Sequence, residues 1–200
     1  MHLVPRICGP NHSFRIHVFQ GKNNLLRKLP ARLKGYKRWL PAEWRIVVLI
    51  DQDQYDCKEL KALLEEAARD AQFTTPAAAR AGQPYQVANR LAIEELEAWF
   101  FGDIPALAKA FPGVSPMLGR QAKYRNPDAI RGGTWEALQR VLQRAGYYPS
   151  GLSKINAAQK ISQHMDPNQN TSSSFQLFRD TLRNLTAPIS PPRPQRASPP

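Results

Sequence analysis

Apolar residues follow two different periods along the first hundred residues, one typical of strands and one typical of helices. Residues 14–19 (FRIHVF) alternate apolar and polar, and residues 45–50 (RIVVLI) form a continuous apolar run; both are predicted strands. A third strand is predicted over 85–93. Leucines spaced as on one helical face predict a helix before the second strand, kinked or restarted at Pro30, and another over about 58–71. This order predicts a parallel sheet with right-handed crossovers.

Only helical patterns follow residue 104. They predict helices at roughly 104–110, 134–145, 153–164 and 174–184, with Thr134 and Ser153 as N-caps. The sequence is therefore divided into an α/β core over 1–103, a helical C-terminal extension packed on it over 104–186, and a disordered, Pro-rich tail over 187–200.

Composition narrows the class of protein. Hydrophobic residues make up 42% of the 200, yet no apolar run approaches the ~20 residues that span a bilayer. The first residues lack the apolar centre of a signal peptide. The only two cysteines, Cys8 and Cys57, form no CxxC pair. These features predict a cytoplasmic protein with reduced thiols and no membrane contact.

Charge is unevenly distributed within the net +12. Residues 1–50 carry ten Lys or Arg against the single acid Glu43, whereas residues 51–100 carry five against ten acids. A basic surface beside an acidic centre fits a phosphate-chain substrate and a metal cluster. A solvated basic face explains the composition equally well.

Asp51 and Asp53 come directly after the predicted central strand. Open α/β sheets place ligand sites at the carboxyl ends of their strands, and two carboxylates at this spacing can converge on one hard cation. Asp56 would add a third oxygen. The alternative is a solvated turn in which Asp56 caps the next helix.

A second acidic cluster follows the 85–93 strand. On a predicted helix, Glu94 and Glu97 share a face while Glu95 points elsewhere, and parallel pairing of the strands would bring this cluster near Asp51. The alternative is that these residues only favour the helix N-terminus by charge.

Basic residues are the candidates for nucleic-acid binding. Most lie on or beside the helix before residue 40, and the rest lie in the KYRNPDAIRGGT loop and near residue 154. The predicted contacts are Lys22, Arg27, Lys28, Arg32, Lys37, Arg38, Lys123, Arg125 and Lys154.

Several sequence blocks resemble the bacterial domain-of-unknown-function family 4276. They are GKNNLLRKLPARLKGY, WRIVVLIDQDQYDCKELK, RLAIEELEAWFFGD, YRNPDAIRGGTWEAL and MDPNQNTSSSFQLF, and the likeness covers roughly residues 14–185. That family is regarded as Toprim-like, and its members occur beside ATPase genes, some in phage-defence pairs. The resemblance therefore implies a four-stranded parallel sheet with Mg²⁺ held by Asp51 and Asp53.

The same resemblance implies a glutamate upstream of this motif, after a first strand. Residues 1–42 contain no Asp or Glu, and the chain starts inside what resembles the family's first helix, near Leu3. Either the true start lies further upstream or this copy has lost that strand and its glutamate. In both cases we expect the chain as written to be a poor nuclease that an N-terminal extension would rescue.

Together these arguments predict a Toprim-like parallel sheet with flanking helices, followed by a helical C-terminal extension. The predicted function is Mg²⁺- or Mn²⁺-dependent nucleic-acid phosphodiester cleavage, with Asp51, Asp53, Glu94 and Glu97 as catalytic residues and Asp51, Asp53, Asp56 and Glu94 as metal ligands. The predicted partners are nucleic acid, an ATPase and a second copy of the chain. The alternative is a non-catalytic nucleic-acid-binding or ATPase-partner subunit.

Overall fold

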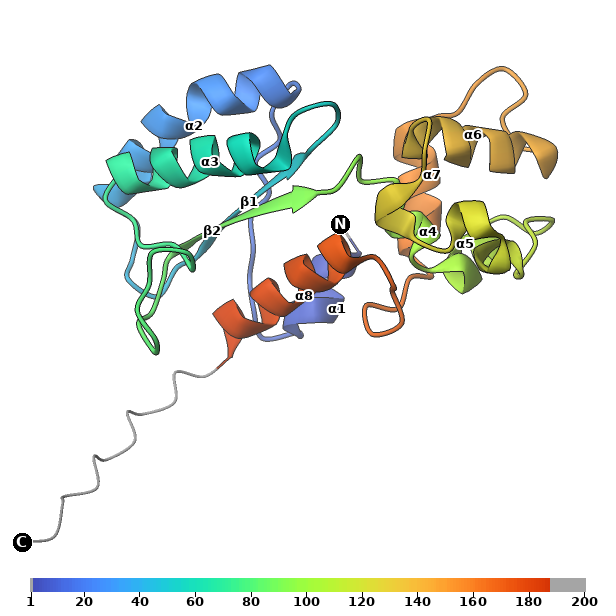
Figure 1. Ribbon diagram of the computed structural model, residues 1–200. Helices are drawn as coiled ribbons and strands as arrows, with labels where there is room; N and C mark the ends of the chain where they lie inside the picture. The colour runs from blue at the N-terminus through green and yellow to red at the C-terminus, as the bar shows by residue number, and fades with distance from the viewer. Residues whose placement is uncertain (1, 188–200) are drawn as a thin grey trace, which may run out of the picture.

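The computed structural model describes residues 2–187, which form a mixed α/β fold. Its centre is a parallel pair of strands, β1 (Ile46–Asp51) and β2 (Val87–Ala92). The register pairs Ile46 with Val87 and Asp51 with Ala92, so both strands end at the same level. The helix α3 (Cys57–Asp70) forms the crossover between them (Figure 1).

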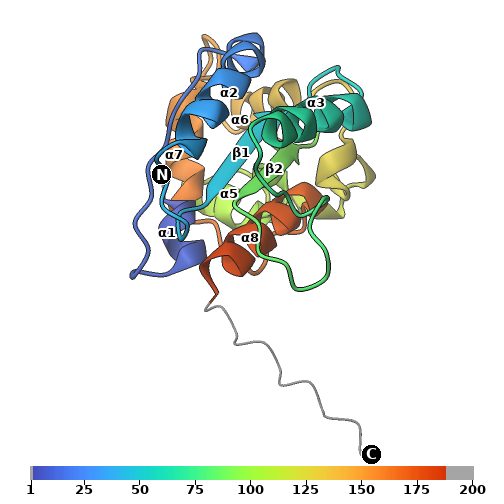
Figure 2. The same ribbon diagram turned by 90° about the vertical axis from the view of Figure 1, so that its left-hand side faces the viewer.

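Side chains of β1 are covered on both faces, as its continuous apolar sequence predicts. Val48 and Ile50 belong to a core cluster with leucines of α3 and of α2 (Lys22–Lys37). Val47 and Leu49 pack against a second cluster on the other face. That face is covered by α8 (Ser173–Thr186), beside which lies the short α1 (Leu3–Cys8) (Figures 1 and 2).

The remaining helices lie beyond the carboxyl ends of the strands (Figure 1). They are α4 (Ala98–Phe101), α5 (Ile104–Ala110), α6 (Thr134–Arg144) and α7 (Lys154–Ser162), with three 3-10 turns at Leu118–Arg120, Ala122–Tyr124 and Pro127–Ala129. Trp99 of α4 joins this group to α8, because its ring packs against Phe175 and Phe178, with both pairs of centroids 5.1 Å apart. None of the helices within residues 2–187 has the length and apolar character needed to cross a bilayer.

The predicted strand at 14–19 is wrong. Residues 12–19 form neither helix nor strand, and the side chains of Phe14, Ile16 and Val18 are exposed. Alternation alone cannot make a strand when no neighbouring strand pairs with it, because an isolated strand leaves its backbone groups unpaired. The sheet accordingly has two strands among the described residues, whereas the family resemblance implied four.

Pro30 neither kinks α2 into two helices nor restarts it, because α2 runs unbroken from Lys22 to Lys37. Proline removes one helical hydrogen bond. The cost is offset by the buried stripe of Leu25, Leu29 and Leu33, which packs both turns beside Pro30 against the same core.

The other predicted elements are confirmed within one to three residues at their ends, including the helix near Leu3. Ser153 stands at the N-cap position of α7 without a side-chain cap bond. Thr134 is not a cap: Gly133 precedes α6, and the Thr134 hydroxyl bonds elsewhere. The predicted disordered tail lies outside the described residues, apart from Ala187.

The attachment of α8 to the core gives a direct test of the packing. Replacing Phe175, which is fully buried, with Ala should lower the free energy of unfolding by about 3–5 kcal/mol, because it removes a large side chain and leaves a cavity beside Trp99. Leu177→Ala on the same helix is the matched control, because Leu177 is 57% exposed. Denaturant unfolding should show a change for the control within about 0.5 kcal/mol. Equal effects of the two substitutions would contradict this packing.

Candidate functional site at the carboxyl end of the sheet

The turns after β1 and β2 are joined by backbone hydrogen bonds. The N–H of Gln52 donates to the carbonyl of Ala92 over 2.9 Å, and the N–H of Asp53 donates to that of Glu94 over 2.7 Å. Asp53 and Glu94 both have left-handed backbone conformations, with φ of 48° and 59°. Such conformations in residues other than glycine cost energy and often accompany functional sites. The pairing of the strands thus brings the two acidic segments together.

Asp53 is held by Lys22, the first residue of α2. The Lys22 ammonium lies 2.7 Å from a carboxylate oxygen of Asp53, donates to the Gln52 carbonyl over 2.6 Å, and lies 4.6 Å from the centre of the Tyr55 ring. The Lys22 side chain is only 11% exposed, whereas that of Asp53 is 48% exposed. Lys22 is therefore built into the turn, and the carboxylate of Asp53 remains open to solvent.

Glu95 and Glu97 converge on Lys154 from α7. The Lys154 ammonium lies 3.5 Å from Glu95 Oε1 and 3.6 Å from Glu97 Oε1. The second oxygen of Glu95 accepts hydrogen bonds from the Thr134 hydroxyl (3.1 Å) and the Trp135 N–H (2.8 Å) at the start of α6. The Glu95 carboxylate thus links the segment after β2 to both α6 and α7.

Among the carboxylates of the site, Asp51 has the most strongly shifted pKa. Partial burial and the negative charges of Glu97, Asp53 and Glu95, in that order, raise the pKa of Asp51 to about 6. Glu97 is itself buried, and burial raises its pKa above the usual range while Lys154 acts in the opposite direction. Several carboxylates therefore share one region that contains too little positive charge to neutralise them.

The predicted pairing of Glu94 and Glu97 on one helical face is wrong, and so is the prediction that Glu95 points away from Glu97. Residues 93–97 are bends and turns, and α4 begins only at Ala98. The structure therefore groups Glu95 with Glu97, while Glu94 contributes its backbone carbonyl to the Asp53 turn. Asp56 accepts hydrogen bonds from the N–H groups of Lys58 and Glu59 and caps α3. This capping role is the alternative that the sequence left open for Asp56.

Divalent cations such as Mg²⁺ bind through one or two protein carboxylates, with water and substrate oxygens completing the shell. The shared negative charge of Asp51 and Glu97 fits this requirement, since a cation would relieve their mutual repulsion. Within residues 2–187, however, no group of three or more His, Cys, Asp or Glu side chains is arranged to hold a metal ion.

The predicted basic contacts fall into two groups. Lys22 and Lys154 belong to the acidic site itself. The others are exposed: Arg27, Lys28, Arg32, Lys37 and Arg38 on or directly after α2, and Lys123 and Arg125 between α5 and α6. Three of them lie over aromatic rings: Arg32 over Phe19, Lys37 over Phe73 and Lys123 over Tyr124.

Sequence patterns did not identify Thr134, Trp135 or the role of Glu95. Trp135 lies under the Lys154 ammonium, which is 4.5 Å from the centre of the ring. No spacing rule connects residues 95, 135 and 154, because three separate segments supply them. The one available signal was that the EELEAWFFGD and YRNPDAIRGGTWEAL blocks, which contain Glu95 and Trp135, are both distinctive of the family resemblance.

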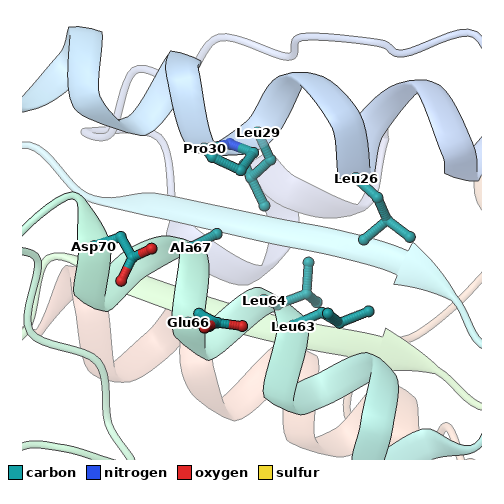
Figure 3. Close-up of a pocket in the computed structure, with 8 residues that line it drawn as sticks. All are labelled: Leu26, Leu29, Pro30, Leu63, Leu64, Glu66, Ala67 and Asp70. Carbon is teal, nitrogen blue, oxygen red and sulfur yellow. The ribbon is translucent and has the colours of Figure 1, made fainter.

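A groove between α2 and α3 is a separate feature (Figure 3). Apolar side chains including Leu26, Leu29 and Leu63 line it, with Glu66 and Asp70 on its α3 side. Its lining includes none of the carboxylates grouped around Asp51. The groove is therefore not part of the acidic site.

The chain was compared with protein families, curated proteins and solved structures. A family model described as "Domain of unknown function (DUF4276)" matches residues 1–183. No curated protein and no solved structure matches the chain.

Asp51→Asn should stabilise the protein at neutral pH. The pKa of Asp51 is 3.8 without its surroundings and about 6 in the fold, so between these values the folded state binds more protons and stability falls as pH rises. Asn cannot ionise, so thermal unfolding should show the variant more stable by about 1–2 kcal/mol at pH near 7.5, allowing for solvent screening. This advantage should disappear below pH of about 4. An advantage independent of pH would contradict the raised pKa.

Proposed function

The chain belongs to the DUF4276 family, and from this premise we propose that it is a Mg²⁺- or Mn²⁺-dependent phosphodiesterase that cleaves nucleic acid. The observation that carries the proposal is the raised pKa of Asp51, produced by burial and neighbouring carboxylates at the carboxyl end of a parallel strand pair. Crowded carboxylates with perturbed pKa values are a mark of functional sites rather than of ordinary surfaces.

In this proposal Asp51 and Glu97 hold the cation, with Asp53 at the rim of the site. A divalent ion bound there would neutralise negative charge and polarise a phosphoryl oxygen of the substrate. Without the cation, Asp51 takes up a proton at a pH of about 6, its pKa in the fold, so protons compete with the cation for this carboxylate. Lys154 holds Glu95 and Glu97 in place while keeping an exposed ammonium beside the site.

The basic residues of α2 would bind the phosphate backbone. Lys22 connects this helix directly to the Asp53 turn, so a backbone lying along α2 is led toward the acidic site. Phosphate contacts of this kind provide affinity without sequence preference. The proposed substrate is therefore nucleic acid bound through its backbone.

The Toprim-like assignment remains part of the proposal. It is supported by an Asp-x-Asp motif at the end of a parallel strand and by acidic residues after the neighbouring strand. The family resemblance further suggests that the chain works with an ATPase in phage defence.

A second candidate is a non-catalytic nucleic-acid-binding or ATPase-partner subunit. It is favoured by two observations: no group of three potential ligands is assembled within residues 2–187, and lysines already pair with Asp53, Glu95 and Glu97. The two candidates differ in metal affinity, since only the enzyme requires a bound divalent ion.

Metal binding and cleavage provide the first test. Calorimetric titration with Mn²⁺ should show binding at pH near 7.5 that weakens below pH of about 6, where Asp51 is protonated. Asp51→Asn and Glu97→Gln should each weaken this binding and reduce Mg²⁺-dependent cleavage of a labelled oligonucleotide by about 10²-fold or more. Asp56→Asn is the control carboxylate and should change neither by more than a few-fold.

Two results would oppose the enzyme. Absence of Mn²⁺ binding in a protein that still binds nucleic acid would favour the non-catalytic candidate. Full activity in Asp51→Asn would place any catalytic site elsewhere.

The role of α2 is tested separately by salt dependence. Replacing Arg27, Lys28, Arg32 and Lys37 with Ala should flatten the plot of log affinity against log salt by about 0.9 for each phosphate that the variant no longer neutralises. The control removes four exposed cations elsewhere, namely Lys109, Arg120, Arg131 and Arg144, and should leave the slope nearly unchanged. An equal effect of both quadruple variants, measured by fluorescence anisotropy, would mean that net charge and not α2 controls binding.

A further inference from the structure

The outer edge of β2 is closed by other parts of the chain. The N–H of Val87 lies 3.4 Å from the carbonyl of Thr74. The carbonyl of Asn89 accepts hydrogen bonds from the side chains of Lys61 (2.6 Å) and Arg90 (2.8 Å). Charged side chains on the edge of a sheet prevent another strand from pairing there. This edge is therefore protected.

The outer edge of β1 has no such protection among the described residues. Ile46 N–H donates to Gln86 and Gln52 N–H donates to Ala92, so the even-numbered residues of β1 bond to β2. Because successive residues of a strand direct their backbone groups to opposite sides, Val47 and Leu49 direct theirs to the outer edge. Within the part of the chain that the structure describes, the backbone groups of these two residues have no hydrogen-bond partner.

The segment of residues 9–21 adds exposed apolar surface on the same side of the molecule. It runs between α1 and α2 on the side of the sheet where β1 lies (Figure 2). Residues 13–18 make no backbone hydrogen bonds with any residue from 2 to 187, and Phe14, Ile16 and Val18 are 41%, 47% and 88% exposed. Exposed apolar residues gathered on one segment, beside an open strand edge, are typical of a binding surface.

The charge around this surface indicates what it binds. Residues 1–50 carry ten Lys or Arg against one acid, and this region includes both the 9–21 segment and most of β1. Arg15, which is exposed, and Arg45, the residue before β1, border the open edge along the sequence, and the Arg45 guanidinium also donates to the carbonyls of Ala42 and Trp44. A second copy, with the same net charge of +12, would be repelled, whereas an acidic chain would be attracted.

We propose that the outer edge of β1 binds an extended acidic segment of a partner protein, which adds to the sheet as a third strand. Backbone groups of Val47 and Leu49 pair with the added strand, and Arg15 and Arg45 attract its carboxylates. Affinity in this mode comes mainly from main-chain hydrogen bonds, and side chains supply the specificity. The inference is independent of the proposed nuclease activity.

The test uses the full chain with a seven-residue strand of alternating Val and Glu joined ahead of His2 through a Gly/Ser linker of about 15 residues. Such a linker has a reach of roughly 20 Å and gives the strand a local concentration on the order of millimolar. Two matched fusions serve as controls: one with Lys at every Glu position, and one with Pro at two central positions, which cannot pair as a strand.

Amide hydrogen exchange, read residue by residue, is the measurement. In the Val/Glu fusion, exchange at Val47 and Leu49 should slow by about ten-fold or more relative to the unfused chain, while Val48 and Ile50, already bonded to β2, change little. The Pro fusion should give no slowing, and the Lys fusion clearly less than the Glu fusion.

Three outcomes would overturn the proposal. If the Val/Glu fusion leaves Val47 and Leu49 unchanged, the edge does not accept a strand. If the Lys fusion protects them equally, the acidic nature of the partner is wrong. If sedimentation shows the unfused chain to be a dimer in which these amides are already protected, the occupant is a second copy and not an acidic partner.

Discussion

The parallel pairing of β1 with β2 is the interaction on which the rest of the structure depends. The register that pairs Asp51 with Ala92 makes both strands end at one level. The turns that follow are then close enough for Asp53 to donate to Glu94. A shift of one residue would turn Val48 and Ile50 away from the core beneath α2 and α3, so hydrophobic burial also fixes where the carboxylates lie.

Placing these carboxylates together has an electrostatic cost, which the fold offsets only in part. Lys22 reaches the site from the segment before β1, and Lys154 reaches it from far beyond β2. Their ion pairs are with Asp53, Glu95 and Glu97, and the pKa of Asp51 is raised to about 6. Burial is the largest cause of this raised pKa, and the neighbouring carboxylates add to it.

The carboxyl end and the two edges of the small sheet differ in which of their groups a partner could reach. The carboxyl end holds the acidic site, the β2 edge is sealed by Lys61 and Arg90, and the β1 edge remains open beside a basic segment. Backbone polarity explains the contrast between the two edges: an unpaired N–H or C=O must find water, a side chain or another strand. The acidic site and the open edge are separate features, since the first depends on side-chain charge and the second on the main chain.

The sequence by itself determined most of the helices, the two paired strands and the position of the central acidic motif. The apolar run RIVVLI required burial on both faces, and the sequence places Asp51 and Asp53 at the end of that strand. Leucine periodicity determined α2 and α3, and the hydrophobicity of Trp99, Phe100 and Phe101 placed them in the core, where they are 1–4% exposed.

Tertiary structure decided what local pattern could not. The FRIHVF segment has strand periodicity, but a strand also needs backbone pairing with a neighbour, and among the described residues this segment pairs with no strand. Helical spacing predicted that Glu94 and Glu97 lie together. The chain turns at these residues instead, so the side chain that lies with Glu97 is that of Glu95. Lys22 and Lys154 joined the carboxylates from distant segments, because electrostatic contacts depend on distance in space and not on separation along the chain.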